Sequence, residues 1–362
     1  MPMPTPFRKP VPTNESFDES VQSQAGRRRS ALRFNLMIAI FVWTMWLIFG
    51  GRFALQHLIA DWRVALTMVF GSLVGGGTSE GGGAIAFPIF TKLLHIAPRD
   101  ARNFSLAIQS IGMGTASLSI LYLRIPIERR ALFYAGLPGV LGVILGSYFV
   151  APYIPPVFVR TSFTVLVSSM GVALFLVNRE RGVLRNGSIP ILGPREKSVL
   201  IAAGFLGGVL SALVGTGENS VVFMVMVLLF RVSEKIVTPT TVVLMTMVTI
   251  PGFLLHLFVL HDFTPTVMGY WLAAMPVVAV GAPLGALICS HMKRHSIVLL
   301  LLFLIALEFF STLFLVPMSQ PVLWVSLGTL IVFGSVDWAM SRATKYRPGM
   351  LPVEGPIPAR DL

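Results

Sequence analysis

Apolar stretches of about 20 residues recur along this chain and restrict its fold more than any other feature. The stretches "SIVLLLLFLIALEFFSTLFLV", from Ser296, and "PVLWVSLGTLIVFGSVDWAM", from Pro321, are each long enough to cross the hydrocarbon core of a membrane. Only 12% of the 362 residues are charged, against about 25% in a typical soluble domain. The sequence therefore predicts an all-α, polytopic membrane protein.

The N-terminal residues are polar and end in the basic run "GRRRSALR". No small-residue cleavage site follows the first apolar stretch, so we expect a basic cytoplasmic tail over residues 1–33 and an extra transmembrane helix over residues 34–60. Arginines elsewhere cluster in short loops beside the apolar stretches, so the net charge of +12 indicates a lipid bilayer as partner and no nucleic acid. The lone cysteine, Cys289, excludes an intrachain disulfide and a cysteine metal cluster. A homo-oligomer is left open.

One pattern occurs twice. The segment "GSLVGGGTSEGGGAIAFPIF" at residues 71–90 recurs loosely, about 135 residues later, as "LGGVLSALVGTGENSVVFMVMVLLF". In each copy a Gly-rich polar break separates two apolar runs. Further along each copy, the pairs Gly142/Gly146 and Gly281/Gly285 have the small-xxx-small spacing that lets helices approach closely. The sequence therefore indicates a duplication.

The lengths of the apolar runs and the positions of the charges predict the topology. Runs 64–74 and 84–94 beside the first break would each form a helix of about 16 Å, roughly half a bilayer. We therefore expect a re-entrant helical hairpin in each copy, which makes the two repeats inverted. This arrangement places 22 of the 28 Lys and Arg on the cytoplasmic side, together with both termini.

The expected fold is two inverted repeats, each with one re-entrant hairpin and three transmembrane helices, plus extra N- and C-terminal helices, which gives eight full crossings. The expected segments after residue 60 are the first repeat at 62–177, a basic cytoplasmic linker at 178–197, the second repeat at 198–316, the extra C-terminal helix at 317–341 and a cytoplasmic tail at 342–362.

The two breaks are the candidate substrate site. Broken helices in inverted repeats place the site of a transporter at the midplane, and the half-helix after each break directs free amides toward it, where an oxyanion would bind. The alternative is that these residues only cap the half-helices. The candidate substrate-binding residues are Thr78, Ser79, Gly81, Gly82, Gly83, Thr216, Gly217, Asn219 and Ser220.

Two carboxylates, Glu80 and Glu218, lie inside the breaks. A charge at the bilayer centre costs at least ~2.5 kcal/mol, so intramembrane carboxylates are usually functional. Each could cap its own half-helix, each could titrate and couple proton movement to that of an anion, or the two could together bind a cation. We favour capping and proton coupling equally over the binding of a cation.

Other polar residues in apolar stretches are weaker candidates. Glu308 and Gln109 could relay protons or make interhelical hydrogen bonds, whereas His256 and Asp337 lie nearer to helix ends. The charged turn "APRDAR" at residues 97–102 is expected to form ion pairs of its own. No nucleophile elbow or phosphate-binding loop is present, and the histidine pair at 291 and 295 has no third ligand nearby, so we expect no enzyme, metal or cofactor.

The repeated glycine motif resembles that of the TauE/SafE sulfite exporter family. The run "GGGAIAFPIF" at 81–90 has three glycines and then Pro88, "ARNFSL" at 101–106 fits the next element, and "GVLSALVGTGENSVVF" occupies the second copy. In that second copy, Glu218 and Asn219 stand where the family pattern has two glycines. The resemblance covers roughly residues 62–316 and implies a plasma-membrane transporter of small sulfur-containing or organic anions, such as sulfite or sulfonates.

We therefore expect a multi-pass plasma-membrane transporter that works by alternating access, with Glu80 and Glu218 as candidate proton-coupling residues. The alternatives are an ion channel or uniporter without proton coupling, and a membrane protein that transports nothing.

Overall fold

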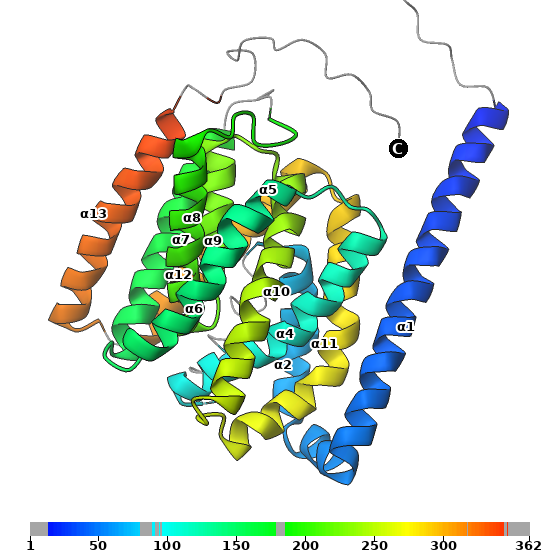
Figure 1. Cartoon of the computed structure of the whole chain (residues 1–362), viewed down its shortest axis with the longest axis horizontal. Helices are drawn as coiled ribbons and strands as arrows, with labels where there is room; N and C mark the ends of the chain where they lie inside the picture. The colour runs from blue at the N-terminus through cyan, green and yellow to red at the C-terminus, as the bar shows by residue number, and fades with distance from the viewer. Residues whose placement is uncertain are drawn as a thin grey trace, which may run out of the picture.

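The computed structural model of the chain describes residues 14–79, 89, 90, 94, 96–178, 185–316, 318–343 and 346, and the side chains of these except 14–29 and 156. The described residues form a bundle of long helices (Figure 1). In chain order they are α1 Asn14–Ala60, α2 Trp62–Gly77, α4 Pro98–Tyr122, α5 Arg129–Ala131, the π-helical turn η2 Leu132–Gly136, α6 Leu137–Phe149, α7 Pro156–Asn178, α8 Pro194–Val214, α9 Glu218–Met224, the π-helical turn η3 Val225–Leu229, α10 Glu234–Phe258, α11 Pro265–His291, α12 Arg294–Leu315 and α13 Gln320–Arg342.

Within the described residues, nine helices are long and apolar enough to cross a membrane. The predicted all-α, polytopic architecture is therefore confirmed. Eight crossings were expected, and the additional long helix is α8. Its 21 residues make the first arm of the predicted second hairpin as long as a full crossing. In addition, α1 begins at Asn14, so part of the predicted tail is helical.

The first break begins later than the glycines suggested. Helix α2 continues through Gly75, Gly76 and Gly77 and ends before Thr78. These glycines do not interrupt the helix because they serve its packing: a Cβ on Gly76 would lie 1.9 Å from the carbonyl oxygen of Ala282. The second break does use glycine geometry, since Gly215 has a φ of 86° and Gly217 a φ of 151°, values that residues with a side chain rarely adopt.

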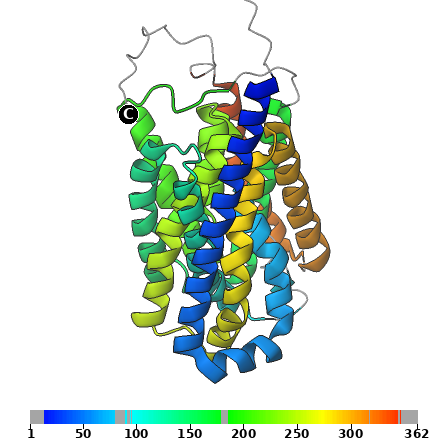
Figure 2. The ribbon, with the colours of Figure 1, turned by 90° about the vertical axis from the view of Figure 1, so that its right-hand side faces the viewer.

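Most of the described helix ends gather on two opposite faces of the bundle (Figures 1 and 2). We call the face where α1 begins and α13 ends the terminal face, and the other the distal face. On the terminal face, the fully buried carboxylate of Glu234 accepts hydrogen bonds from Arg185 Nη2 at 3.2 Å and from Arg294 Nε at 2.7 Å. This ion-pair network joins the starts of α10 and α12 to the segment that precedes α8.

Helices α4 and α10, which occupy equivalent places in the two copies, run antiparallel. Arg99 in the first turn of α4 contacts Asp262, just beyond the end of α10. At the other face the amide of Glu128, beyond the end of α4, donates a 2.8 Å hydrogen bond to Thr240 near the start of α10. Counterpart helices therefore run in opposite directions, as inverted repeats require. The repeat boundaries themselves remain predictions.

The small-xxx-small glycines hold the two copies together. Helix α2 of the first copy packs on α11 of the second, and its counterpart α8 packs on α6 of the first. A Cβ on Gly285 would lie 2.0 Å from the carbonyl oxygen of Leu73, and one on Gly142 would lie 2.2 Å from that of Phe205. The close approach predicted from the glycine spacing is thus confirmed at both contacts.

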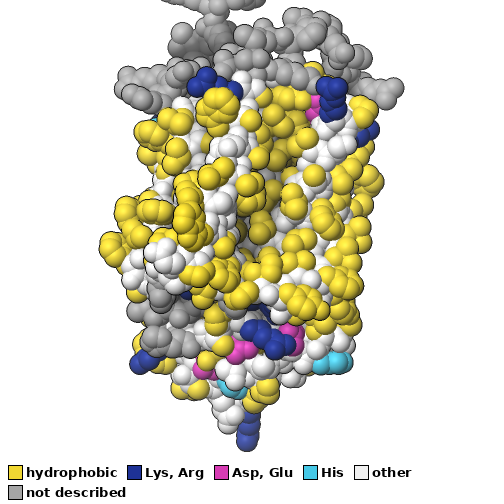
Figure 3. All heavy atoms as spheres, turned by 90° about the vertical axis from the view of Figure 1, so that its left-hand side faces the viewer, with side chains coloured by type: hydrophobic (Ala, Val, Ile, Leu, Met, Phe, Trp, Pro, Cys, Tyr) yellow, Lys and Arg dark blue, Asp and Glu magenta, His cyan; other side chains and the backbone are white. Residues whose placement is uncertain are grey.

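The outer surface is apolar between the two faces. Figure 3 shows hydrophobic side chains over the middle of the bundle and charged side chains near its two ends. Large apolar residues of α12 and α13, such as Phe303, Trp324 and Ile331, are exposed. In water such a surface would aggregate, whereas lipid tails solvate it, so the bundle is built to lie across a bilayer.

Candidate functional site

The two breaks meet inside the bundle. The side-chain amide of Asn219, in the first turn of α9, donates a 2.5 Å hydrogen bond to the backbone carbonyl of Ser79 at the end of α2. The oxygen of the same amide accepts hydrogen bonds from Thr216 Oγ1 at 3.2 Å and from the Gly217 amide at 3.1 Å. Asn219 therefore links two segments that lie 140 residues apart, and all four residues are among those predicted from the sequence.

Helix α4 completes this region from the side. Gln109 Nε2 donates to the Gly215 carbonyl at 2.8 Å, and Ser105 Oγ donates to the same oxygen at 3.2 Å. Gly215 cannot carry a side chain here, because a Cβ would lie 2.6 Å from the Cβ of Ser105. Of the two roles considered for Gln109, the structure shows hydrogen bonding between segments.

Glu218 is the most isolated charged residue of the break. It has no exposed surface, and neither carboxylate oxygen has a hydrogen-bond partner among the described residues. Its side chain packs against α6 at Gly139, where a Cβ would lie 2.7 Å from Oε1. The hydroxyls of Ser79 and Ser220 are likewise fully buried and unpartnered within the described part of the chain. Buried polar groups usually have partners, so this is an unusual concentration of unsatisfied groups.

Two amides and one hydroxyl that were expected to be free for a substrate already have hydrogen-bond partners. The Glu218 amide donates to Ser211 Oγ at 3.1 Å, and the Gly217 amide bonds Asn219 as described above. The hydroxyl of Thr78 donates back to the Val74 carbonyl of its own helix at 2.9 Å. An anion at this half-helix would therefore have to displace protein groups. The remaining predicted residues, Glu80, Gly81, Gly82 and Gly83, lie outside the described residues.

A pocket of about 550 Å³ opens on the distal face. We call it the distal pocket. Its inner wall includes Leu213 and Val214, the last residues of α8 before the second break. Its polar lining includes Arg99, Arg102, Ser147, Arg160, His256 and Asp262.

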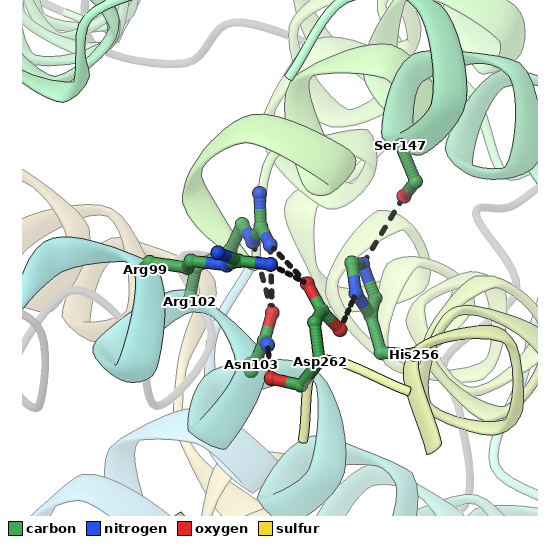
Figure 4. Close-up of polar contacts among 6 residues, drawn as sticks. All are labelled: Arg99, Arg102, Asn103, Ser147, His256 and Asp262. Atoms are coloured by element: carbon green, nitrogen blue, oxygen red, sulfur yellow. Dashed lines mark hydrogen bonds and ion pairs between the residues drawn. The ribbon is translucent and has the colours of Figure 1, made fainter. Parts of the chain in front are cut away.

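Asp262 is the centre of a connected polar cluster in this pocket (Figure 4). Its Oδ2 accepts from Arg99 Nη2 at 3.1 Å and from Arg102 Nη2 at 3.3 Å, and its Oδ1 lies 2.7 Å from His256 Nδ1. On the other side of the imidazole, His256 Nε2 lies 3.2 Å from the Ser147 hydroxyl. The cluster thus joins α4, α6, α10 and the α10–α11 loop.

The arginines and the histidine keep Asp262 ionised. Burial alone would raise the pKa of this carboxyl, but the hydrogen bond and charge of His256, with Arg99 and Arg102, outweigh burial and hold its pKa well below the ordinary value. Residues 97–102 do form ion pairs, as predicted. Their partner was predicted wrongly, because it is not within the turn but is Asp262, 160 residues from Arg102. The contact of His256 with Asp262 was not predicted, because the position of His256 near the end of an apolar stretch is typical of an ordinary helix end.

A second pocket, of about 200 Å³, opens on the terminal face. We call it the terminal pocket. It is lined by Gly76 near the end of α2, by Lys235 and Thr238 in the first turns of α10, and by Cys289 near the end of α11. Each pocket therefore reaches the helix that leads into one break, the distal pocket through α8 and the terminal pocket through α2.

Two other buried acids join helices to α7. Glu308 of α12 accepts from Thr164 Oγ1 at 3.0 Å, and Asp337 of α13 accepts from Ser169 Oγ at 2.6 Å, so both attach their helices to α7. Among the described residues, no cluster of His, Cys, Asp and Glu could hold a metal ion.

Comparison with known proteins agrees with this architecture. The family model described as sulfite exporter TauE/SafE matches residues 64–312, which include both breaks, both pockets and the pairs of packed helices. No curated protein and no solved structure matches the chain. Since the match covers more than half of the sequence, the chain belongs to the sulfite exporter TauE/SafE family of membrane transporters.

Proposed function

We propose that the protein moves a small sulfur-containing or organic anion, of the sulfite and sulfonate class, across the plasma membrane by alternating access between the distal and terminal pockets. The observation that carries this proposal is the position of the pockets: they open on opposite faces, and each ends beside a helix that leads into one break. The breaks meet at the hydrogen bond from Asn219 to Ser79, so a movement of one break is coupled to the other.

The charge of the pocket linings supports an anionic substrate. Three arginines line the distal pocket and Lys235 lines the terminal pocket. Cationic linings concentrate anions at both entrances. The substrate would pass between the pockets at the predicted residues of the two breaks, where the hydroxyls of Ser79 and Ser220, which have no partner in the described part of the chain, are donors for its oxygens.

We further propose that Glu218 couples transport to protons. An ionised carboxylate without a partner is costly in a membrane interior, and neither oxygen of Glu218 has a hydrogen-bond partner among the residues that the structure describes. The residue would hold a proton here and release it when the region rearranges. Glu80 at the first break is the matching candidate.

The distribution of Lys and Arg indicates the orientation of the protein in the membrane. The start of α1, the end of α13, the end of α4 and the starts of α8, α10 and α12 lie on the terminal face (Figure 1), and most Lys and Arg of the sequence belong to these segments or directly adjoin them. Because positive residues are retained on the cytoplasmic side, we propose that the terminal face is cytoplasmic. A reporter that fluoresces only in the cytoplasm, fused to the C-terminus, tests this: fluorescence is expected, and a dark fusion protein contradicts it.

The test of function is flux into proteoliposomes. Uptake of labelled sulfite and of propane-1-sulfonate is measured with and without a pH gradient, for the wild type and for the double variant Glu80→Gln, Glu218→Gln. Asp337→Asn is the matched control, because it also neutralises a buried intramembrane acid but lies on α13, outside the family match.

We expect saturable uptake that follows the pH gradient in the wild type and the control and loses this dependence in the double variant. Uptake that does not depend on the pH gradient in any of the three proteins would support transport but refute proton coupling. Uptake that never saturates would indicate a channel, and no uptake of either anion would overturn the substrate class.

A further inference from the structure

The distal pocket has more positive than negative charge in its lining. Three of its lining residues, Arg99, Arg102 and Arg160, are arginines, and among the described residues that line it only Asp262 is an acid. That one carboxylate already contacts two of the guanidinium groups and the imidazole of His256. Within the lining, three guanidinium groups therefore share one carboxylate, while Asp100 and Glu308, which are not among the lining residues, attract Arg102 and Arg160 from behind.

The arginines approach the pocket from two elements. Arg99 and Arg102 come from the first turns of α4, and Arg160 comes from the start of α7. Arg99 is at the mouth, with a side chain that is 66% exposed, whereas the Arg102 side chain is only 10% exposed. A ligand entering from the distal face would therefore meet Arg99 first and Arg102 deeper in the pocket.

The position of Arg102 is fixed before any ligand arrives. Its Nε and Nη2 donate to the side-chain oxygen of Asn103 at 3.0 and 2.9 Å, and the Asn103 amide donates to the Asp262 carbonyl at 3.0 Å. A neutral amide fixes the guanidinium plane without cancelling its charge. Fixed guanidinium groups are the side chains that best match the oxygens of carboxylate, phosphate and similar oxyanions.

Most of the other lining residues are apolar. Val159, Leu213, Val214 and Leu260 are among the pocket residues. A cavity of about 550 Å³ is in the size range of small-molecule sites and is larger than a bare sulfite ion needs. It has room for an anionic head group and a short carbon body.

We propose that the distal pocket is a binding site for an organic oxyanion, whose head group lies between Arg99 and Arg102 of α4 and Arg160 of α7 and whose carbon body contacts Val159 and the end of α8. This site is separate from the residues of the breaks. The proposal rests on the proposed function only for the ligand class, and it makes the distal pocket the place where substrate is held before it reaches the second break.

Binding to the purified protein in detergent tests the site without transport. Isothermal titration with propane-1-sulfonate is run on the wild type, Arg160→Gln, Arg160→Lys and the control Arg63→Gln. Arg63 is exposed at the start of α2, near the distal face, and contacts the ring of Trp62 instead of the pocket. Titration with propan-1-ol, which lacks the anionic head, is the ligand control.

We expect a Kd for propane-1-sulfonate that rises about tenfold in Arg160→Gln, because one charge-assisted contact is lost, and that rises less in Arg160→Lys. Arg63→Gln should bind as the wild type does, and propan-1-ol should not bind measurably. Thermal unfolding of each variant shows whether it is folded. If Arg160→Gln is unfolded, Arg160→Lys decides the question, since it keeps the charge but not the planar fork.

No binding to the wild type, or the same Kd in all folded variants, overturns this inference. The outcome for transport is separate. Binding that depends on Arg160 in a protein without flux would refute the proposed function and keep the site. Saturable flux with an unchanged half-saturation concentration in Arg160→Gln would keep the function and refute the site.

Discussion

The backbone contact between α2 and α11 should tolerate no added methyl group. In Gly285→Ala the new Cβ would lie 2.0 Å from the carbonyl oxygen of Leu73, about 1.4 Å inside the 3.4 Å at which ordinary contact begins. Backbone atoms cannot rotate away, so α2 has to move. The matched control is Gly114→Ala on α4, where an added Cβ meets nothing within 4 Å.

The magnitude follows from two opposing effects. Overpacking a filled interior costs about 3 kcal/mol at the upper end of its usual range, and replacing glycine by alanine in a helix returns about 1 kcal/mol. The net loss in Gly285→Ala is therefore about 2 kcal/mol, which corresponds to a fall in Tm of about 4 °C. Gly114→Ala has only the favourable effect, so its Tm should equal or exceed that of the wild type.

Thermal unfolding of the purified proteins in one detergent, at one scan rate, provides the assay. The flux assay adds a second readout, because α2 ends directly before Thr78 and Ser79 and a displaced α2 moves that break. A Tm for Gly285→Ala at or above that of the wild type would refute the claim that glycine at this position is required for helix contact.

Two further substitutions test the polar contacts. Asn219→Ala leaves the Ser79 carbonyl and the Gly217 amide without their partner, so we expect a loss of about 1–3 kcal/mol together with loss of flux; full flux with an unchanged Tm would show that the two breaks are not coupled through this side chain. Asp262→Asn should lower the Tm at pH 7, because the lowered pKa of Asp262 stabilises the folded protein above the ordinary pKa of about 3.9. The difference from the wild type should shrink as the pH falls below about 4, and a difference that grows with acidity would contradict this assignment.

Much of the fold could be predicted because hydrophobic length and glycine spacing are local signals. The apolar stretches predicted the helices, and Gly142/Gly146 and Gly281/Gly285 predicted close helix contacts that the structure contains. What could not be predicted was where helix α2 stops. A glycine run weakens a helix in isolation, but here Gly76 is held helical by its contact with Ala282, which only the tertiary structure reveals.

The candidate site was predicted in part for the same reason. The duplicated pattern indicated that the two breaks are equivalent segments, which predicted that they meet. The hydrogen bond from Asn219 to Ser79 shows that they do. The distal pocket was not foreseen. Its central contact pairs Arg102 with Asp262 across 160 residues, and no spacing in the sequence connects the start of one helix with a loop so far along the chain.

Alternating access between the two pockets is tested most directly by the reactivity of cysteines. The native Cys289 lines the terminal pocket, and Ala151→Cys in a Cys289→Ser background places a thiol in the distal pocket. Each protein is reconstituted and labelled with a membrane-impermeant maleimide, with and without saturating propane-1-sulfonate. We expect the anion to change the two labelling rates in opposite directions, because one pocket closes as the other opens. Rates that rise together would contradict it and indicate a continuous pore.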